Sequence, residues 1–331
     1  MSIHWGNNIL MKKINDTIYQ LTMPTPFAVG DVHAYLIKGD VLSIVDTGVK
    51  TKDAWEALLF QLKEIGYMPH DIEQIILTHH HPDHIGFIEE FPRAERIIAH
   101  ENVNYFLTKD TGYFQNDMDY FNKFLQMAGV PDGFPSTMER LHSTYNYAGR
   151  GEVTHPITED MTLPGHLDWS VVETKGHAQS HLSFLHNRDR LFIGGDHLLE
   201  HISPNPILES PLNQQHDRPK PLLQFRSNLQ KCRELDIKTV LPGHGNVFEN
   251  VEKVIAGYLS SQEKRSAKVF RLLELETLTP FEICKKLFPK QFKTELGLTM
   301  SETIGQLDYL ESIGRVQMEM KEGIHYYKVR V

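Results

Sequence analysis

The sequence predicts an α/β protein in which two packed β-sheets are flanked by helices and followed by a small α+β module. Three observations indicate this fold class. Apolar or β-branched runs alternate with helical patterns in two similar halves, a histidine-rich segment directly follows one of these runs, and the pattern changes after His244. Strands and helices that recur in this way bury their apolar faces by packing in layers around a common core.

The first half is expected to form one sheet and one long helix. Its short apolar or β-branched runs are separated by glycine or aspartate, which is typical of strands joined by tight turns. We expect strands at 17–21, 34–37, 42–45, 72–77 and 96–99. Segment 52–65 carries apolar residues at helical spacing and is predicted to be a helix. Residues 101–150 are rich in aromatic side chains and are predicted to be a helical insertion over the site.

The second half repeats the strand pattern and ends in a different kind of segment. We expect strands at 157–163, 169–174, 181–186, 190–193 and 239–241, and a helix at 222–235. After His244 the chain predicts a long helix at 251–275, two shorter helices at 280–287 and 301–313, and two strands at 315–320 and 325–329. Helix, helix and β-hairpin is the order of a winged helix-turn-helix. We therefore predict a catalytic domain at 1–248 and a winged-helix-like domain at 249–331.

Composition limits the classes of function that are open to the chain. A net charge of −9 argues against general coating of nucleic acid, which needs a basic footprint. The N-terminus lacks the apolar run of a signal peptide, and no stretch approaches the ~18 apolar residues of a membrane span. Two cysteines are too few for a disulfide framework and fit a reducing compartment. A cytoplasmic protein that acts away from the membrane is the expectation.

One short segment carries four residues of the types that bind metals. After an apolar run, the chain reads Thr-His-His-His-Pro-Asp-His at 78–84, which places candidate ligands at His79, His81, Asp83 and His84. Because side chains alternate along a strand, His79 and His81 are expected to point to the same side. Imidazoles and a carboxylate suit Zn²⁺ and similar divalent metals. The spacing therefore predicts a metal site.

Ligands from one segment cannot enclose a pair of metals, so others must come from elsewhere. Three candidates share one context, in which a short apolar strand ends in glycine beside histidine or aspartate: His177, Asp196 and His244. Asp46, which follows the run 42–45, belongs to the same class. Glycine at such a strand end lets the backbone turn sharply and approach a bound group closely.

These motifs, in this order, resemble the metallo-β-lactamase superfamily over about residues 14–250, with a segment at 78–84 similar to that of the glyoxalase II group. The resemblance implies an αββα sandwich with two divalent metals at one edge, most simply Zn²⁺, with Fe or Mn as alternatives. It implies that one metal is held by His79, His81 and His177. It implies that the other is held by Asp83, His84 and His244, that Asp196 bridges both, and that Asp46 orients a ligand. True β-lactamases of this superfamily carry cysteine at the position of Asp196, so penicillin hydrolysis is not expected.

Such a site predicts a hydrolase in which a hydroxide bridges two metals about 3.5–4 Å apart. Asp83 and Asp196 are the candidate catalytic groups, because each can orient the hydroxide or carry its proton. His201, in the loop that follows Asp196, is a candidate substrate-binding residue. The expected substrate is a small ester, thioester or lactone. A metal-dependent ribonuclease or phosphodiesterase and an iron-dependent oxidoreductase on the same scaffold are the alternatives.

The sequence of the C-terminal module does not by itself identify what the module binds. A winged helix usually binds nucleic acid, but the expected second helix at 301–313 contains Glu302, Asp308 and Glu311 and no lysine or arginine. That surface suits phosphates poorly. Nucleic acid is therefore not favoured as a partner, and a structural role or a homodimer formed through this module is the better expectation.

Overall fold

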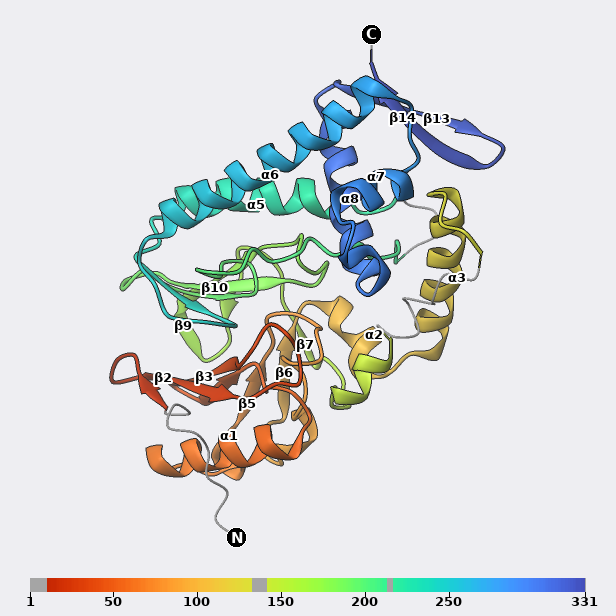
Figure 1. Ribbon diagram of the computed structural model, residues 1–331. Coiled ribbons are helices and arrows are strands. Elements are labelled where there is room, and N and C mark those ends of the chain that lie inside the picture. The colour runs from red at the N-terminus through yellow and green to blue at the C-terminus, as the bar shows by residue number, and fades with distance from the viewer. Residues whose placement is uncertain (1–10, 133–141, 213–216, 331) are drawn as a thin grey trace.

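The first of the two large sheets forms the N-terminal layer of the protein. Figure 1 shows a computed structural model that describes residues 11–132, 142–212 and 217–330. The sheet has seven strands in chain order: β1 (Lys12–Lys13), β2 (Ile18–Met23), β3 (Val32–Lys38), β4 (Leu42–Val45), β5 (Gln74–Ile76), β6 (Arg96–Ala99) and β7 (His155–Pro156). The pairs from β1 to β4 are antiparallel and those from β4 to β7 are parallel.

The second sheet has five strands in the order β12-β11-β10-β9-β8. These strands are β8 (Thr162–Leu163), β9 (His166–Glu173), β10 (Leu182–His186), β11 (Leu191–Gly195) and β12 (Thr239–Pro242). β11 and β12 are parallel, and the other pairs are antiparallel. The strand expected at 157–163 is mostly absent, because Asp160 adopts a left-handed conformation with φ of 67° that interrupts extended pairing.

The two sheets pack face to face, and helices cover their outer faces. Alternation along β3 sends Tyr35 and Ile37 into the layer between the sheets, where they share a buried cluster with Phe184 of β10. Leu36, on the opposite face, packs against Leu58 of α1 (Lys52–Ile65). On the far side of the second sheet a separate cluster joins it to α5 (Pro221–Glu234) and α6 (Val251–Leu275). These four layers appear in sequence from α1 to α6 in Figure 1, and they confirm the predicted α/β sandwich.

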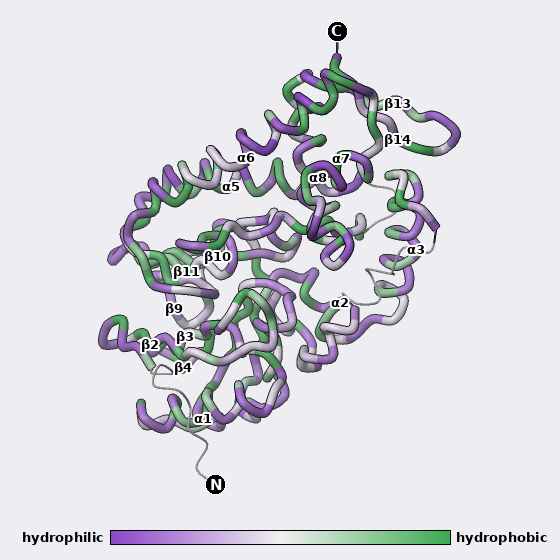
Figure 2. Tube along the Cα trace, viewed as in Figure 1, coloured by the Kyte–Doolittle hydropathy of each residue, from purple (hydrophilic) through white to green (hydrophobic). Residues whose placement is uncertain are grey.

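The ends of α1 show why the chain forms a helix there. The Thr51 side chain caps its N-terminus by accepting a hydrogen bond from the Ala54 amide, and Gly66, at φ of 93°, ends the helix in a left-handed conformation. Apolar positions at helical spacing place one face of α1 on the sheet. In Figure 2, hydrophobic and hydrophilic positions alternate along α1, α5 and α6 in the same way.

Helices of the expected insertion lie beside one end of the sandwich. They are α2 (Asn104–Leu107) and α3 (Thr111–Met127), which follow β6 directly. Asp110 caps α3 by accepting a hydrogen bond from the Tyr113 amide. Part of the expected insertion, residues 133–141, lies outside the described residues.

The C-terminal segment has the expected element order of helix, helix and hairpin. After α6 it forms α7 (Pro280–Leu287), α8 (Leu296–Ser312), β13 (Val316–Lys321) and β14 (Ile324–Val329). This order is compatible with a winged helix. The second helix begins at residue 296 rather than 301, and Leu296 and Met300 of its added turn are buried in the module's core.

The C-terminal segment packs closely on the sandwich and on the insertion. Nη2 of Arg218 donates to both carboxylate oxygens of the buried Asp308 of α8, at 2.7 and 2.9 Å. The first half of α6 belongs to the sandwich core and its second half to the core of the C-terminal segment. The predicted domain boundary at residue 248 therefore falls just before α6, a helix that both parts share. The division into two domains stays a prediction.

Among the residues that the structure describes, no helix combines the length and the apolar character that crossing a membrane would need.

Candidate metal centre

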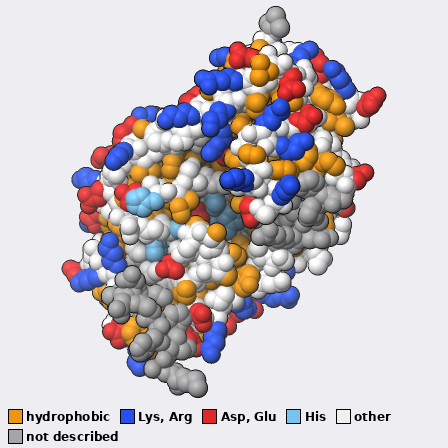
Figure 3. All heavy atoms as spheres, in the orientation of Figure 1, with side chains coloured by type: hydrophobic (Ala, Val, Ile, Leu, Met, Phe, Trp, Pro, Cys, Tyr) orange, Lys and Arg blue, Asp and Glu red, His pale blue; other side chains and the backbone are white. Residues whose placement is uncertain are grey.

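The histidine-rich segment leaves the end of β5 and places its side chains at one edge of the sandwich. His79 and His84 are fully buried, and His81 is partly exposed. The Nε2 atom of His79 lies 3.0 Å from the Nδ1 atom of His81. Two ring nitrogens that face each other at this distance cannot both donate, so a proton or a cation must lie between them. Figure 3 shows histidine side chains reaching the surface near the middle of one face of the molecule.

The second sheet brings three more predicted ligands to the same edge. Asp196 directly follows β11 and His244 follows β12, and these parallel strands end side by side. His177 follows β9. The Asp196 carboxylate lies 3.4 Å from Nε2 of His177 and 3.5 Å from Nε2 of His244.

The seven predicted ligands form two groups with Asp196 between them. His79, His81 and His177 make one group, and Asp83, His84 and His244 make the other, with ligand atoms within 4.8 Å of one another in each. Nε2 of His244 lies 3.3 Å from Asp83. Asp196 shares a third group with His79 and His84. The arrangement therefore offers two three-ligand positions and one carboxylate that faces both.

Several inward-facing atoms of this cluster lack hydrogen-bond partners among the described residues. They are the Nε2 atoms of His84, His177 and His244, and Oδ1 of Asp196. Buried polar atoms without partners are rare because each costs free energy. Imidazole nitrogens and carboxylate oxygens are ligands for divalent transition metals. The residues present therefore fit metal ions, and bound ions would satisfy these atoms.

Hydrogen bonds on the outer side orient the rings. Asp46, held at φ of 59°, accepts hydrogen bonds from Nδ1 of His84 and from the amide and hydroxyl of Thr78, each at 2.8 Å. The Thr78 oxygen in turn lies 2.9 Å from Nδ1 of His79. Because the Thr78 hydroxyl donates to Asp46, its oxygen can accept from that ring. Both histidines thus keep a lone pair on Nε2 for the cluster.

Backbone carbonyls orient the two remaining distant histidines. Nδ1 of His177 donates to the carbonyl of Asn205 at 3.1 Å, and Nδ1 of His244 donates to the carbonyl of Asp31 at 2.8 Å. The side chain of Asn205 also donates to the carbonyl of Leu298 in α8, at 3.1 Å. The C-terminal segment therefore contacts the residue that holds His177 in place.

The charges of the cluster favour a cation. Burial opposes ionisation of Asp196, but His244 and His84 lower the pKa of this carboxyl well below its usual range. Burial likewise opposes protonation of His244, yet Asp196 and Asp83 raise the pKa of this imidazole to about 10. Without metal, the positive charge of protonated histidine balances the negative charge of the buried carboxylates. Divalent ions would take over this role and release those protons.

Glycine allows the two strand ends to approach each other. A Cβ atom on Gly243 would lie 2.2 Å from Oδ1 of Asp196 and 2.9 Å from Cε1 of His84. A Cβ on Gly195, which has φ of 49°, would lie 2.8 Å from Nε2 of His181. That same Nε2 accepts a hydrogen bond from the backbone amide of Asp196 at 3.0 Å. A side chain at Gly243 would overlap predicted ligands, and one at Gly195 would overlap His181, which supports the backbone of Asp196.

His201, the predicted substrate-binding residue, lies apart from this constellation. Its side chain is 70% exposed, and its Nε2 lies 3.1 Å from Glu200. It does not join any of the three ligand groups found in the described residues. Its role in substrate binding stays a prediction.

A cavity beside the cluster is lined by polar residues that belong to no recognisable sequence motif. His81 and Pro82 line it, together with Asp117 of α3, His142 and Glu209. Asp117 accepts a hydrogen bond from Ser210 at 2.5 Å and lies 3.0 Å from Nε2 of His142. No local sequence pattern marks these residues, because they come from three separate segments.

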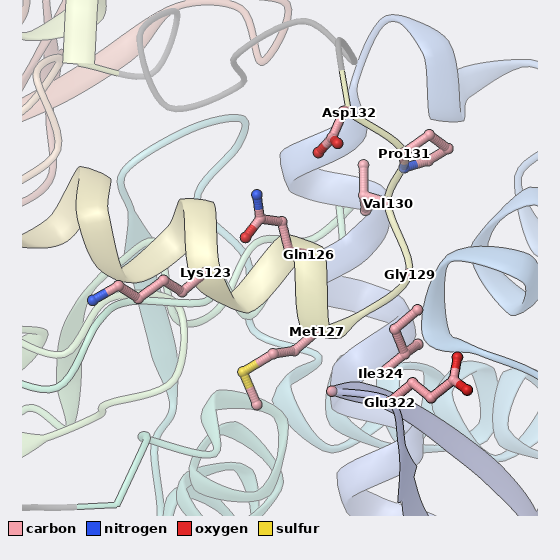
Figure 4. A pocket seen from close by; sticks show the side chains of 10 residues that line it. Lys123, Gln126, Met127, Gly129, Val130, Pro131, Asp132, Glu322 and Ile324 are labelled. Atoms are coloured by element: carbon pink, nitrogen blue, oxygen red, sulfur yellow. The ribbon is translucent and has the colours of Figure 1, made fainter.

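A second hollow lies farther away, between the end of α3 and the turn that joins β13 to β14 (Figure 4). Lys123, Met127, Glu322 and Ile324 are among the residues that line it. None of the predicted ligands does so, and this hollow is separate from the metal centre.

Comparison with known proteins agrees with the geometry. The family model described as the metallo-beta-lactamase superfamily matches residues 28–244. A probable metallo-hydrolase of Bacillus subtilis, YqjP, is 36% identical over 313 residues, which are 95% of this chain and 98% of that protein. An N-acyl homoserine lactonase of Agrobacterium fabrum, AttM, is 28% identical over 38% of this chain and 40% of its own.

A solved structure extends the similarity to the C-terminal segment. The metallo-beta-lactamase family protein TTHA1429 of Thermus thermophilus superposes with a TM-score of 0.78 at 26% identity, covering 96% of this chain and all of that one. The family resemblance inferred from the sequence is thereby confirmed. The chain belongs to the metallo-β-lactamase superfamily, as a metal-dependent hydrolase.

Proposed function

We propose that the protein is a dinuclear hydrolase that cleaves a small ester, thioester or lactone. The observation that carries the proposal is the pair of three-ligand groups around Asp196, in which the Nε2 atoms of His84, His177 and His244 have no hydrogen-bond partner among the described residues. Two metals bound there, most simply zinc, would supply Lewis acidity and a hydroxide nucleophile at neutral pH. The protein needs no serine or cysteine nucleophile for such a reaction.

The chain's own residues would bind the reacting groups and move the proton. Asp83 and Asp196 both lie within 3.5 Å of Nε2 of His244, so a carboxylate is available to orient the attacking water and accept its proton. Asp46, Asn205 and Asp31 hold the histidines from outside, which preserves the geometry during turnover.

Two further observations favour a small carbonyl substrate. The cavity beside His81 is small, and aromatic and aliphatic side chains make up more than half of its lining, which suits an uncharged organic group better than a polynucleotide. Part of the chain is also similar to AttM, named an N-acyl homoserine lactonase.

A structural role is proposed for the C-terminal segment. Helix α8, the counterpart of a recognition helix, is buried along most of its length, and its acidic side chains already have partners. Asp308 pairs with Arg218, and Glu302 pairs with Arg265 at 2.5 Å. A helix enclosed in this way offers little surface to nucleic acid.

Metal analysis and a substrate panel test the proposal together. The purified protein should hold about two metal ions per chain and hydrolyse at least one ester, thioester or lactone, while RNA and phosphodiesters remain intact. Asp196→Ala should abolish this hydrolysis and lower the metal content. Full activity in Asp196→Ala would refute the bridging role, and cleavage of phosphodiesters alone would favour the nuclease alternative.

A further inference from the structure

The cavity beside His81 has the position of a substrate pocket. His81 belongs to the first ligand group, and it is the partly exposed member of that group. His81 and Pro82 form one wall, and the opposite walls come from the insertion and from the loop at 207–209. The aromatic and aliphatic residues that line it include Phe106, Tyr113, Phe114, Phe121, Tyr145 and Ile207. A group held there would lie directly beside the metal centre.

The size of the cavity sets a narrow limit on its occupant. It offers about 50 Å³ to the centres of water-sized atoms. At roughly 10–15 Å³ for each such atom, this is room for about three to five non-hydrogen atoms. A longer chain would have to displace tightly packed rings, such as Phe106, which stacks on His80 with ring centroids 3.7 Å apart.

The polar groups of the cavity limit the charge of its occupant. Asp117 is buried and already accepts a hydrogen bond from Ser210. The Glu209 carboxylate accepts a hydrogen bond from the backbone amide of Gln179 at 2.8 Å, and the Glu209 side chain is only 12% exposed. Burial, reinforced by the charge of Asp117, raises the pKa of Glu209 to about 8. The charge of Asp117 therefore disfavours a further negative charge in this small cavity, whereas Glu209 stays neutral below about pH 8 and offers a hydrogen-bond donor instead.

We propose that this cavity is the acyl pocket of the metal centre, and that it takes an uncharged aliphatic acyl group of about three to five carbon atoms. It excludes longer chains by volume and acyl groups with a terminal carboxylate by charge. The inference rests on the proposed hydrolase function and adds the substrate class: short-chain acyl esters or thioesters. Phe114, on α3, is the proposed specificity-determining residue, because it lines the pocket without being fully buried in the core.

A chain-length series tests the pocket. Metal-loaded wild type would be assayed with acetyl, butyryl, pentanoyl, hexanoyl, octanoyl and succinyl thioesters that share one leaving group. We expect kcat/KM to be highest for butyryl or pentanoyl, and about tenfold or more lower for octanoyl and succinyl. Phe114→Ala should move the optimum to longer chains.

Phe124→Ala is the matched control. Phe124 is also a partly buried phenylalanine of α3, but it does not line the cavity, so its loss should leave the chain-length optimum unchanged. Phe114→Leu removes less volume and should shift the optimum in the same direction if Phe114→Ala fails to fold. A flat chain-length profile, or an optimum that Phe114 variants leave in place, would overturn the inference.

A binding experiment separates this inference from the proposed function. If wild type hydrolyses no ester, thioester or lactone, the hydrolase proposal fails, and calorimetry with butyrate, octanoate and succinate then judges the pocket alone. Tighter binding of butyrate than of the other two, with the preference lost in Phe114→Ala and kept in Phe124→Ala, supports the pocket. Equal or absent binding of all three acids overturns it.

Discussion

Glu209→Gln should stabilise the protein at alkaline pH and change its stability much less at pH 5. The Glu209 side chain is only 12% exposed, and burial, followed by the charge of Asp117, raises its pKa from 4.5 to about 8. The folded protein therefore keeps this proton over a range in which the unfolded chain has lost it. Unfolding then releases a proton, so rising pH lowers the free energy of unfolding from about pH 4.5 to about pH 8.

The size of the effect follows from the difference in pKa. One pKa unit corresponds to ~1.4 kcal/mol, which gives an upper bound of about 3–4 kcal/mol for the loss of stability between pH 5 and pH 8. We expect about 2–3 kcal/mol, because solvent relaxation reduces the cost of a buried charge. Glutamine keeps the acceptor for the Gln179 amide and never ionises, so this pH-dependent loss should disappear.

Urea unfolding of the metal-free protein at pH 5 and pH 8 measures this difference. Metal-free protein is used because nearby cations would lower the pKa of the carboxyl. Glu95→Gln, at an exposed position, is the matched control and should leave the pH dependence as in wild type. Equal stability changes for Glu209→Gln at the two pH values would show that Glu209 ionises normally in the folded protein.

The remaining predictions concern the metal centre. Asp46→Ala should weaken metal binding by about 10–100-fold, as loss of a group that orients a ligand usually does. Equilibrium dialysis measures the affinity. An unchanged affinity would mean that Asp46 does not orient His84. Gly243→Ala should lose metal while the protein still folds, because its Cβ would overlap Asp196. Gly257→Ala, whose Cβ meets nothing within 4 Å, is the control and should bind metal normally. Chelation should lower the thermal midpoint of wild type, since the cluster then loses its cations, and an unchanged midpoint would argue against a metal-stabilised cluster.

Much of the candidate site could be predicted from the sequence because the predicted ligands, which the structure brings together, occupy recognisable local contexts. His79 and Asp83 lie in one short segment, whose spacing alone indicates a metal. His177, Asp196 and His244 each follow a strand, and strand ends of one sheet edge meet in space. The sandwich was predictable for the same reason, since alternation along strands such as β3 marks two buried faces.

The parts that could not be predicted depend on contacts between distant segments. Glu209 lies in an irregular loop, and its burial beside Asp117 arises only when that loop packs on α3. The early start of α8 carries no capping signal, and packing of Leu296 in the C-terminal core determines it. His201 is close to Asp196 in sequence and its side chain is 70% exposed, so its role in substrate binding stays a prediction.

The side chain of Asn205 gives the C-terminal segment a share in the metal centre. The backbone carbonyl of Asn205 accepts a hydrogen bond from His177, and its side-chain amide donates to the carbonyl of Leu298, so one residue contacts both α8 and a predicted metal ligand. Exchanging the C-terminal segment between relatives should therefore disturb the contact that Asn205 makes with Leu298. A chimaera that joins this catalytic half to a foreign C-terminal segment would need a backbone carbonyl in the position of that of Leu298 to keep the hydrogen bond from Asn205.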